Sequence, residues 1–409
     1  MVGTFIMTKR PLHLSYSAIA DFKACPTRFR NKYVLGLRTV EDTEVQRVGT
    51  NWHRILDIAT RKPGSVCTRC ANEQANDPEC TLCAGTGFLP DDIMDAVTRE
   101  INRIYSEKTF SDPIAAETER VKLLYSLSGY RWYYSEQPEE VITREQHFDL
   151  TLRNPETGHT LPNVRLVGCI DKIINWNGHP AIKEHKSTSN SVDPDSTYWG
   201  HLNLDTQTTL YLYAARRWQA DGLLESWGIK ASDPLISKIL YDVWHRPQIS
   251  PKKLTQAESK KFVADGEYCG QKFEVIDGDK EPLDPRYSFI INGCGVDIEP
   301  GAKPGTFAIQ ETPEMYGARL LADIVERPEF YFRCVELSRI NKEMESFEYE
   351  LVNIYRTMQE MIRTGHWYGN EQQCEAKYKC DYISCCYNGV DVESGIVPDG
   401  FKLIFDKEK

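Results

Sequence analysis

The sequence predicts an α/β protein in which helices flank a mixed central sheet, and three observations carry that prediction. Two runs rich in Ile and Val flank Asn177-Gly178, a strong signal for a two-residue β-hairpin turn. Amphipathic helical periodicity precedes this hairpin and returns after it. Two pairs of closely spaced cysteines in the N-terminal half predict a small metal-bound loop inserted into the fold.

Composition limits the class of protein. A chain of 409 residues can hold two domains or one core with large insertions, and we favour the second. With 41% hydrophobic and 27% charged residues and no apolar run long enough to span a bilayer, an ordinary soluble protein without a membrane partner is expected. The first residues do not resemble a secretory signal, which predicts a cytoplasmic location, the host cytoplasm if the chain is phage-encoded. A net charge of −11 argues against nonspecific adhesion to nucleic acid, although a local basic groove with bound cations can still bind it.

The hairpin places charged residues opposite one another. If Asn177 and Gly178 form the turn, Asp171 falls opposite Glu184, with Cβ atoms roughly 5 Å apart. Lys186 shares the face of Glu184 because side chains two apart in a strand point the same way. Opposed carboxylates repel unless a cation lies between them, and their hard oxygens suit Mg²⁺ or Mn²⁺. The adjacent ammonium can neutralise charge on a bound phosphate.

Two other interpretations of this hairpin remain open. The Glu-x-Lys pattern is also typical of an ordinary exposed strand with a surface ion pair. Pro180 cannot donate to the ladder and can shift the register by introducing a bulge.

The N-terminal segment predicts helices. Residues 14–37 show helical spacing, and Pro26 places Cys25 at a helix end. The basic residues after Cys25 indicate a solvated helix face or, less readily, a surface for a nucleic-acid backbone. Residues 48–61 predict a helix that carries His53. That histidine is either packed in the core or the third ligand of a metal site with the hairpin carboxylates.

Residues 67–88 contain two CxxC motifs separated by nine residues. Four thiolates with this spacing match a closed tetrahedral zinc site, and turns at Gly85 and Gly87 let the backbone fold tightly around sulfur. We favour a structural zinc that holds a loop too small for a core of its own. The ligands would be Cys67, Cys70, Cys80 and Cys83.

The remaining elements follow in chain order. Residues 91–138 predict helices, and 145–152, 164–175 and 235–245 predict strands. A helix is expected from near Leu204, with Gln207 and Tyr211 on one face. Residues 260–312 receive no role, and 313–363 predict long charged helices.

The C-terminal region is rich in cysteine. Three of its cysteines, together with Cys25, can ligate a metal centre. A second zinc site, a local four-sulfur site and simple buried thiols are the alternatives, although adjacent Cys385 and Cys386 would chelate one ion awkwardly. The remaining members of this group are Cys374 and Cys380.

Taken in order, these motifs resemble the RecB-like branch of the PD-(D/E)XK nuclease superfamily, which includes CRISPR-associated adaptation nucleases and phage exonucleases. Members show an N-terminal cysteine, a histidine helix, a G-x-x-D strand, an E-x-K strand, a Q-x-x-x-Y helix and a C-terminal cysteine trio. The matching positions are Cys25, His53, Gly168 to Asp171, Glu184 to Lys186, Gln207 to Tyr211, and Cys374, Cys380 and Cys386. The spacing between the first two C-terminal cysteines is wider here than in many relatives.

The resemblance implies roles for these residues. His53, Asp171, Glu184 and the His185 carbonyl would bind Mg²⁺ or Mn²⁺, and Lys186 would orient the attacking water or stabilise charge. Gln207 and Tyr211 would position DNA. The four outer cysteines would hold a [4Fe–4S] cluster that joins the two chain ends, with Cys385 as the alternative to Cys386. The two-CxxC loop would be an insertion.

The expected organisation and function follow from this resemblance. A restriction-endonuclease-like core at 91–245 would be preceded by a helical part at 1–60 and a zinc knuckle at 61–90, and followed by an insertion at 246–312 and a helical region at 313–409. The chain would be an exonuclease on single strands or duplex ends of DNA, in recombination, repair or phage DNA processing, with a helicase or recombinase as a possible partner. The alternative is a non-catalytic nucleic-acid-binding scaffold that keeps the fold and metal centres.

Overall fold

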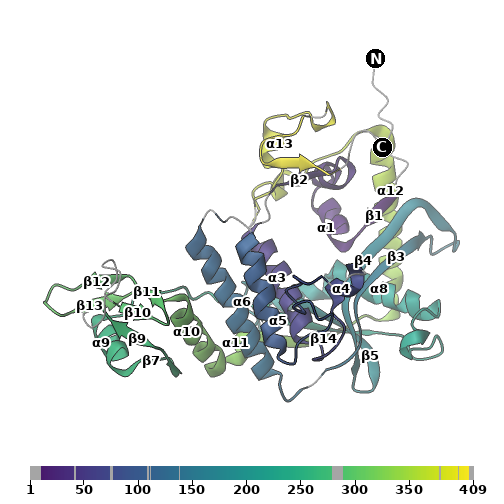
Figure 1. The fold of residues 1–409 in the computed structure, drawn as a ribbon. Coiled ribbons are helices and arrows are strands. Elements are labelled where there is room, and N and C mark those ends of the chain that lie inside the picture. The colour runs from purple at the N-terminus through teal and green to yellow at the C-terminus, as the bar shows by residue number, and fades with distance from the viewer. Residues whose placement is uncertain are drawn as a thin grey trace.

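A six-stranded mixed sheet lies at the centre of the computed structural model, which describes residues 11–40, 43–73, 77–107, 110, 112–137, 139–278, 289–376, 379–394 and 396–404. The strand order is β1-β4-β5-β6-β14, and β3 pairs with the other edge of β4. Helices flank the sheet, so the predicted α/β class is confirmed (Figure 1). The strands are β1 (Leu12–Leu14), β3 (Glu140–Arg153), β4 (Thr160–Trp176), β5 (His179–Thr188), β6 (Lys238–His245) and β14 (Phe332–Ser338).

The β4–β5 hairpin has the predicted register. Asn177 and Gly178 have φ values of 53° and 82°, as a tight turn with two left-handed residues requires. The ladder runs from the turn to the pair Lys172–Lys183. Pro180 pairs within it without a register shift, so the anticipated bulge does not form. One further step along this register leads from Lys172 and Lys183 to the two predicted site carboxylates.

The sequence failed to predict two strands of the sheet. β1 is only three residues long and pairs parallel with β4. β14 pairs antiparallel with β6 inside the stretch 313–363, where the sequence predicts only helices. β14 is an edge strand, so its side chains alternate between more buried and exposed positions. The charged residues at the exposed positions make the strand pattern hard to recognise between two helices. The helices of that stretch are α10 (Pro313–Glu326), α11 (Pro328–Tyr331) and α12 (Asn341–Thr364).

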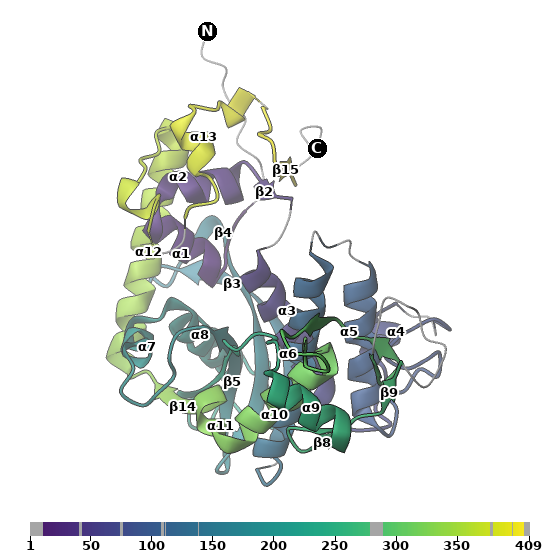
Figure 2. The same ribbon diagram turned by 90° about the vertical axis from the view of Figure 1, so that its left-hand side faces the viewer.

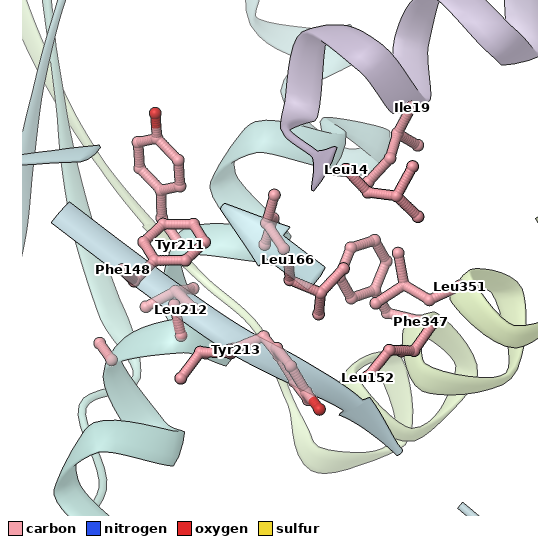
Figure 3. Close-up of a cluster of buried hydrophobic side chains, with 14 of the residues drawn as sticks. Leu14, Ile19, Phe148, Leu152, Leu166, Tyr211, Leu212, Tyr213, Phe347 and Leu351 are labelled. Carbon is pink, nitrogen blue, oxygen red and sulfur yellow. The ribbon is translucent and has the colours of Figure 1, made fainter. Parts of the chain in front are cut away.

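Two apolar clusters fix the helices to the two faces of the sheet. On one face, Leu166 of β4 and Ile239 of β6 pack with α8 and α12, as Figure 3 shows around Leu166. On the other, Trp244 of β6 packs with α3, α5 and α6. The covering helices are α1 (Tyr16–Ala24), α8 (Thr206–Ala220), α3 (Glu44–Ala59), α5 (Ile93–Glu107) and α6 (Pro113–Tyr133), and shorter turns at Thr197–Gly200 (α7), His201–Leu204 and Glu225–Trp227 flank α8.

The described residues 246–278 and 289–312 form a small β-rich unit beside α10, at the left of Figure 1. Phe262, Phe289 and Ile309 form its apolar core, to which α10 adds Met315. A capping box at Thr255 starts its helix. Its elements are α9 (Gln256–Asp265), β7 (Glu267–Tyr268), β8 (Gln271–Lys272), β9 (Val275–Asp277), β10 (Phe289–Ile291), β11 (Cys294–Gly295), β12 (Ile298–Pro300) and β13 (Phe307–Ile309).

The N-terminal and C-terminal segments meet at one end of the molecule (Figure 2). Strand β2 pairs with β15, and the Tyr382 hydroxyl donates to the Leu37 carbonyl at 2.8 Å. The elements here are α2 (Pro26–Phe29), a π-helix (Arg30–Val34), β2 (Leu37–Thr39), 3₁₀ turns (Glu371–Gln373 and Val392–Ser394), α13 (Ile383–Tyr387) and β15 (Phe401–Leu403). None of the described helices combines the length and hydropathy that a membrane span requires.

Candidate active site

The candidate active site lies at a gap in the sheet. On one edge of β4, β1 pairs with residues 164–166 and β5 pairs with residues 172–176. The residues between these ranges have no ladder partner on that edge. Asp171 lies in the gap, and its Oδ2 accepts a hydrogen bond from the His185 backbone N–H at 2.9 Å. The Asp171 side chain thus accepts a hydrogen bond from a backbone N–H of β5 that has no ladder partner on β4.

Gly168, which opens the G-x-x-D motif, lies in the same gap. A Cβ at this position would stand 2.5 Å from the Phe148 ring and 3.3 Å from Tyr211. Both rings are buried, and they pack edge to face with centroids 5.8 Å apart. The glycine therefore allows the aromatic pair to approach the backbone of β4.

We predict that Gly168→Ala lowers the free energy of unfolding by about 1–3 kcal/mol, because the methyl group overpacks a buried site. Gly200→Ala is the matched control, since a Cβ there would meet nothing within 4 Å. Urea unfolding followed by circular dichroism measures both. Equal stability of the two variants would contradict the role given to Gly168.

His53 reaches the site from helix α3. A capping box at Thr43 starts this helix, and Trp52 stacks on Trp244 of the sheet with ring centroids 4.2 Å apart. These contacts fix the helix so that His53 Nδ1 lies 3.3 Å from Asp171 Oδ2. Burial favours the neutral imidazole, but the hydrogen bond and charge of Asp171 outweigh it and raise the pKa of His53. The predicted histidine and aspartate are thus neighbours.

Glu184 is held through only one of its oxygens. Oε1 accepts from Lys186 Nζ at 2.7 Å and from Gln207 Nε2 at 2.6 Å. Oε2 is buried and has no hydrogen-bond partner among the described residues. Burial, opposed by Lys186 and reinforced by Asp171, raises the pKa of Glu184 to about 7. Both oxygens of an ionised carboxylate are acceptors. Oε2 of Glu184 therefore lacks the donor or cation that it requires among the described residues.

The free oxygen fits a divalent cation. A buried acceptor without a donor is costly, and a cation would satisfy it and favour the ionised carboxylate. The donor set of carboxylate oxygens and one imidazole suits Mn²⁺ or Mg²⁺. His53, Asp171 and Glu184 do not form a compact ligand group with all atoms within 4.8 Å, so the site is more open than a closed structural site.

The other two predicted residues stand behind these groups. Gln207 and Tyr211 lie one helical turn apart on α8, and both are buried. Gln207 holds Glu184, while Tyr211 packs on Phe148 in the apolar cluster of Figure 3. Gln207 therefore links α8 to the carboxylate of Glu184. Sequence reasoning did not anticipate this contact.

A buried charged cluster supports the site from the other side of β5. His185 Nδ1 lies 3.0 Å from Asp242 Oδ2, and Lys183 Nζ lies 3.3 Å from the same oxygen. The Tyr130 hydroxyl also donates to Asp242, and Lys183 pairs with Glu139. Sequence reasoning missed this cluster. An Asp inside the apolar run of β6 was the available signal, because a buried charge requires partners.

Glu145 is a further carboxylate that sequence reasoning missed. Its pKa is raised by burial and by the charges of Asp171 and Asp57, and Cys169 Sγ donates to it at 3.5 Å. Its φ of 48° interrupts the regular strand next to the site. The sequence places it only at the start of a predicted strand, so no local pattern distinguishes it.

The two CxxC pairs converge in the loop that contains α4 (Thr68–Glu73). Cys67 Sγ lies 3.7 Å from Cys80 Sγ, and Cys70 Sγ lies 3.5 Å from Cys83 Sγ. All four ligand atoms lie within 4.8 Å of one another, and no other such group of His, Cys, Asp or Glu occurs in the described part of the chain. The loop thus contains four buried thiols that could hold a metal ion.

The backbone turns around these thiols as predicted. Gly85 has a φ of 79°, and a Cβ there would stand 3.0 Å from the backbone of Pro78. Burial opposes ionisation of Cys83, but hydrogen bonds from the Gly87 backbone and from neighbouring thiols lower its pKa to about 7. The surroundings of Cys83 therefore favour its thiolate, the form that binds a metal, while the pKa values of Cys67 and Cys70 are raised.

Glu100 of α5 ties this loop to the body of the protein. It is 1% exposed and accepts hydrogen bonds from Arg69 at 2.7 Å, from Thr81 at 2.7 Å and from Arg103 at 2.8 Å. Burial opposes ionisation, but these donors outweigh it and hold the pKa of Glu100 at about 2. The pKa of Glu100 is lower in the folded chain than in the unfolded chain. The ionised Glu100 therefore contributes to the free energy of unfolding above pH ~4.5, and this contribution is lost as the pH falls toward 2.

We predict that Glu100→Gln lowers the free energy of unfolding by about 3 kcal/mol at pH 7, and that the difference shrinks below pH ~4.5. Urea unfolding at several pH values measures it. Glu360→Gln, on an exposed helix face, is the control and should leave stability unchanged. A Glu100 effect that is independent of pH would argue against the ion-pair explanation.

The outer cysteines gather where the chain ends meet. Cys25 lies between α1 and α2, and the Cys380 N–H donates to the Cys374 carbonyl at 2.9 Å. Burial raises the pKa of Cys386, and the nearby charges of Cys380, Cys25 and Cys374 add to that effect. Cys385 instead packs in the apolar cluster beside Leu37. The sulfur atoms of these cysteines do not all lie within 4.8 Å of one another, unlike those of the CxxC loop.

Comparison with known proteins agrees with this arrangement. No curated protein matches the sequence. A family does match, the PD-(D/E)XK nuclease superfamily, over residues 13–387, a range that includes the gap in the sheet, the Glu184–Lys186 pair, α8 and the C-terminal cysteines. The chain therefore belongs to the PD-(D/E)XK nuclease superfamily.

Proposed function

We propose that the chain is a Mg²⁺- or Mn²⁺-dependent DNA exonuclease that acts in recombination, repair or phage DNA processing. One observation carries the proposal: Oε2 of the buried Glu184, beside Asp171 and Lys186, has no hydrogen-bond partner in the described part of the chain. Membership of a nuclease superfamily makes nucleic acid the substrate. DNA rather than RNA, and attack from strand ends, follow from the resemblance to RecB-like exonucleases.

His53, Asp171 and Glu184 would hold the ion, and the His185 carbonyl is the fourth proposed ligand. A bound ion would make hydroxide available near neutral pH and would offset charge on the phosphate. Gln207 fixes Oε1 of Glu184, which leaves Oε2 for the metal. In this way Gln207 of α8 orients a metal ligand, and the positioning of DNA by Gln207 and Tyr211 stays part of the proposal.

Lys186 acts through its charge. Burial opposes the ammonium form, but the carboxylate of Glu184 outweighs it and raises the pKa of Lys186 above its ordinary value. An ammonium that keeps its proton cannot take one from water. We therefore infer that Lys186 stabilises the negative charge that develops on the phosphate oxygens.

Two further metal centres belong to the proposal. The four buried thiols of the CxxC loop suit a structural Zn²⁺, because paired thiols within bonding reach of one ion match closed tetrahedral coordination. Cys25, Cys374, Cys380 and Cys386 suit a [4Fe–4S] cluster, whose cubane holds its thiolates further apart than a single ion does. The burial of Cys385 in an apolar cluster favours Cys386 as the fourth ligand.

The test is cleavage of end-labelled DNA by purified full-length protein. We predict that Mn²⁺ or Mg²⁺ supports degradation and that excess chelator abolishes it, because the proposed hydrolysis needs a divalent cation at Glu184 and Asp171. Circular DNA without ends should survive. Tight DNA binding without metal-dependent cleavage would instead support the scaffold interpretation, and cleavage of circular DNA would replace the exonuclease by an endonuclease. A cytoplasmic setting and a helicase or recombinase partner remain parts of the proposal that this assay does not address.

A further inference from the structure

A hollow lies where the chain leaves the carboxyl ends of β5 and β6, on the face of the sheet that α3 and α6 cover, and it has no role in the chemistry described above. It measures about 560 Å³ and is bordered by the first turns of α3 and α6 and by the chain that leaves β5 and β6. Ser189 at its rim follows Lys186 by three residues, which at the rise of a strand is roughly 10 Å. The same helix α3 carries His53 further along. The hollow is therefore connected to the proposed metal ligands through α3 and through the end of β5.

Two cations line this hollow without an ion-pair partner. Lys122 of α6 and Arg246, which follows β6, both border it. Neither side chain forms an ion pair with a carboxylate within the described part of the chain, and Arg246 Nε is buried without a hydrogen-bond acceptor. Burial lowers the pKa of Lys122, and the like charge of Arg246 lowers it further against the opposing charges of Glu44 and Glu119. Two unpaired positive charges side by side indicate a place for an anion.

The carboxylates at the hollow make their described contacts with other groups. Glu119 is bound by Arg47 through both oxygens, at 2.9 and 2.6 Å. Asp112 caps α6 and accepts from two backbone N–H groups at 3.0 Å each. Glu44 is exposed at the rim. Among the described residues, none of these carboxylates is in ion-pair contact with Lys122 or Arg246.

One further group in the wall of the hollow lacks a partner. Trp244, which also lines the hollow, is 2% exposed, and its indole N–H has no acceptor among the described residues. A phosphate group offers the charge and the acceptor oxygens that these groups lack.

We propose that this hollow is a phosphate-binding subsite, in which Lys122 and Arg246 hold a backbone or terminal phosphate of the nucleic-acid strand next to the one that is cleaved. The inference rests on the proposed nuclease function. It makes the hollow a positioning element: a strand held there would lead its neighbouring phosphate to Lys186 and the metal ligands. Backbone contacts of this kind position a substrate without reading its sequence.

The test measures binding of fluorescein-labelled single-stranded DNA to the full-length chain by anisotropy, in a Glu184→Gln background that leaves the DNA intact. We expect Lys122→Gln and Arg246→Gln each to weaken binding about tenfold and to reduce the slope of log Kd against log salt by about 0.7. Lys260→Gln, an exposed lysine on the remote helix α9, is the matched control and should change neither. Lys122→Arg keeps the charge and should retain the affinity.

Two additions keep the test decisive. Ser189→Glu places a negative charge at the exposed rim without disturbing packing, and should weaken binding even if the Gln variants fold poorly. Strands with and without a 5′-phosphate distinguish the source of the group: an effect confined to phosphorylated strands assigns a terminal phosphate, and an equal effect assigns an internal one. Unchanged affinity and salt slope in folded Lys122→Gln, Arg246→Gln and Ser189→Glu variants would overturn the subsite alone. A parent protein that binds no nucleic acid would overturn the proposed function with it.

Discussion

Replacing Glu184 by glutamine is expected to reduce metal-dependent DNA cleavage on the order of 10³-fold, because the change removes the charge that the metal and the transition state require. Glutamine keeps the shape of the side chain. It also has an amide acceptor for Lys186 and Gln207, which hold Oε1 at 2.7 and 2.6 Å. The loss should therefore appear in the rate and in metal affinity, with little change in fold.

Three measurements separate this effect from trivial causes. Glu336→Gln on the exposed edge strand β14 is the matched control, and its cleavage rate should stay within about twofold of the parent. Calorimetric titration with Mn²⁺ should show weaker binding to Glu184→Gln than to the control. Circular dichroism should show the same fold for all three proteins. Equal degradation by the parent and by Glu184→Gln would remove Glu184 from the chemistry.

The proposed catalytic pair could be located from the sequence because it depends on local chain geometry. A turn at Asn177 and Gly178 sets the register of the β4–β5 hairpin, and register determines which side chains oppose each other. The CxxC loop is similar, since its ligands lie close in sequence and the spacing itself indicates a shared ion. In both cases the residues that meet lie within a few tens of residues of one another in the sequence.

The remaining features depend on contacts that no local pattern records. β14 follows β6 by more than 80 residues, and its half-exposed pattern resembles that of the charged helices around it. Asp242 meets His185 and Tyr130 only because β5, β6 and α6 pack together. Glu145 reaches Asp171 through an irregular point of β3. Tertiary packing, which the sequence alone does not give, creates each of these neighbourhoods.

Replacing Asp242 by alanine is expected to lower the free energy of unfolding by about 3–5 kcal/mol, because the change removes one of the two carboxylates that pair with the buried Lys183 ammonium. Asp242 is 2% exposed and contacts Lys183, His185 and Tyr130. Burial opposes its ionisation, but Lys183 and the hydrogen bonds outweigh it and hold the pKa of Asp242 below its usual range. Its contribution is thus fully present at neutral pH and is lost only in strong acid. Asp149→Ala, in an exposed pair with Arg165, is the control and should cost less than about 1 kcal/mol.

The neighbouring imidazole predicts how this stability depends on pH. Burial, together with the charge of Lys172, lowers the pKa of His185 to about 3 despite the opposing effect of Asp242. The unfolded chain therefore binds more protons than the folded chain between pH ~6.5 and ~3, and the parent should lose stability as the pH falls through that range. Urea unfolding across the range measures the loss. A profile that is flat down to pH 4 would contradict a buried neutral imidazole.

Asp242→Asn separates the effect on the site from the effect on the fold. The amide keeps the size of the side chain and one acceptor for His185, so the fold should survive where alanine weakens it. The loss of charge at position 242 frees the imidazole of His185. The backbone N–H of the same residue, His185, donates to Asp171 at 2.9 Å. We expect a 10- to 100-fold loss of Mn²⁺ affinity, typical of residues that orient metal ligands, with a rate at saturating metal closer to that of the parent. An unchanged metal affinity in a folded Asp242→Asn protein would restrict Asp242 to stabilising the fold, since a positioning residue must act on the metal through His185 and Asp171.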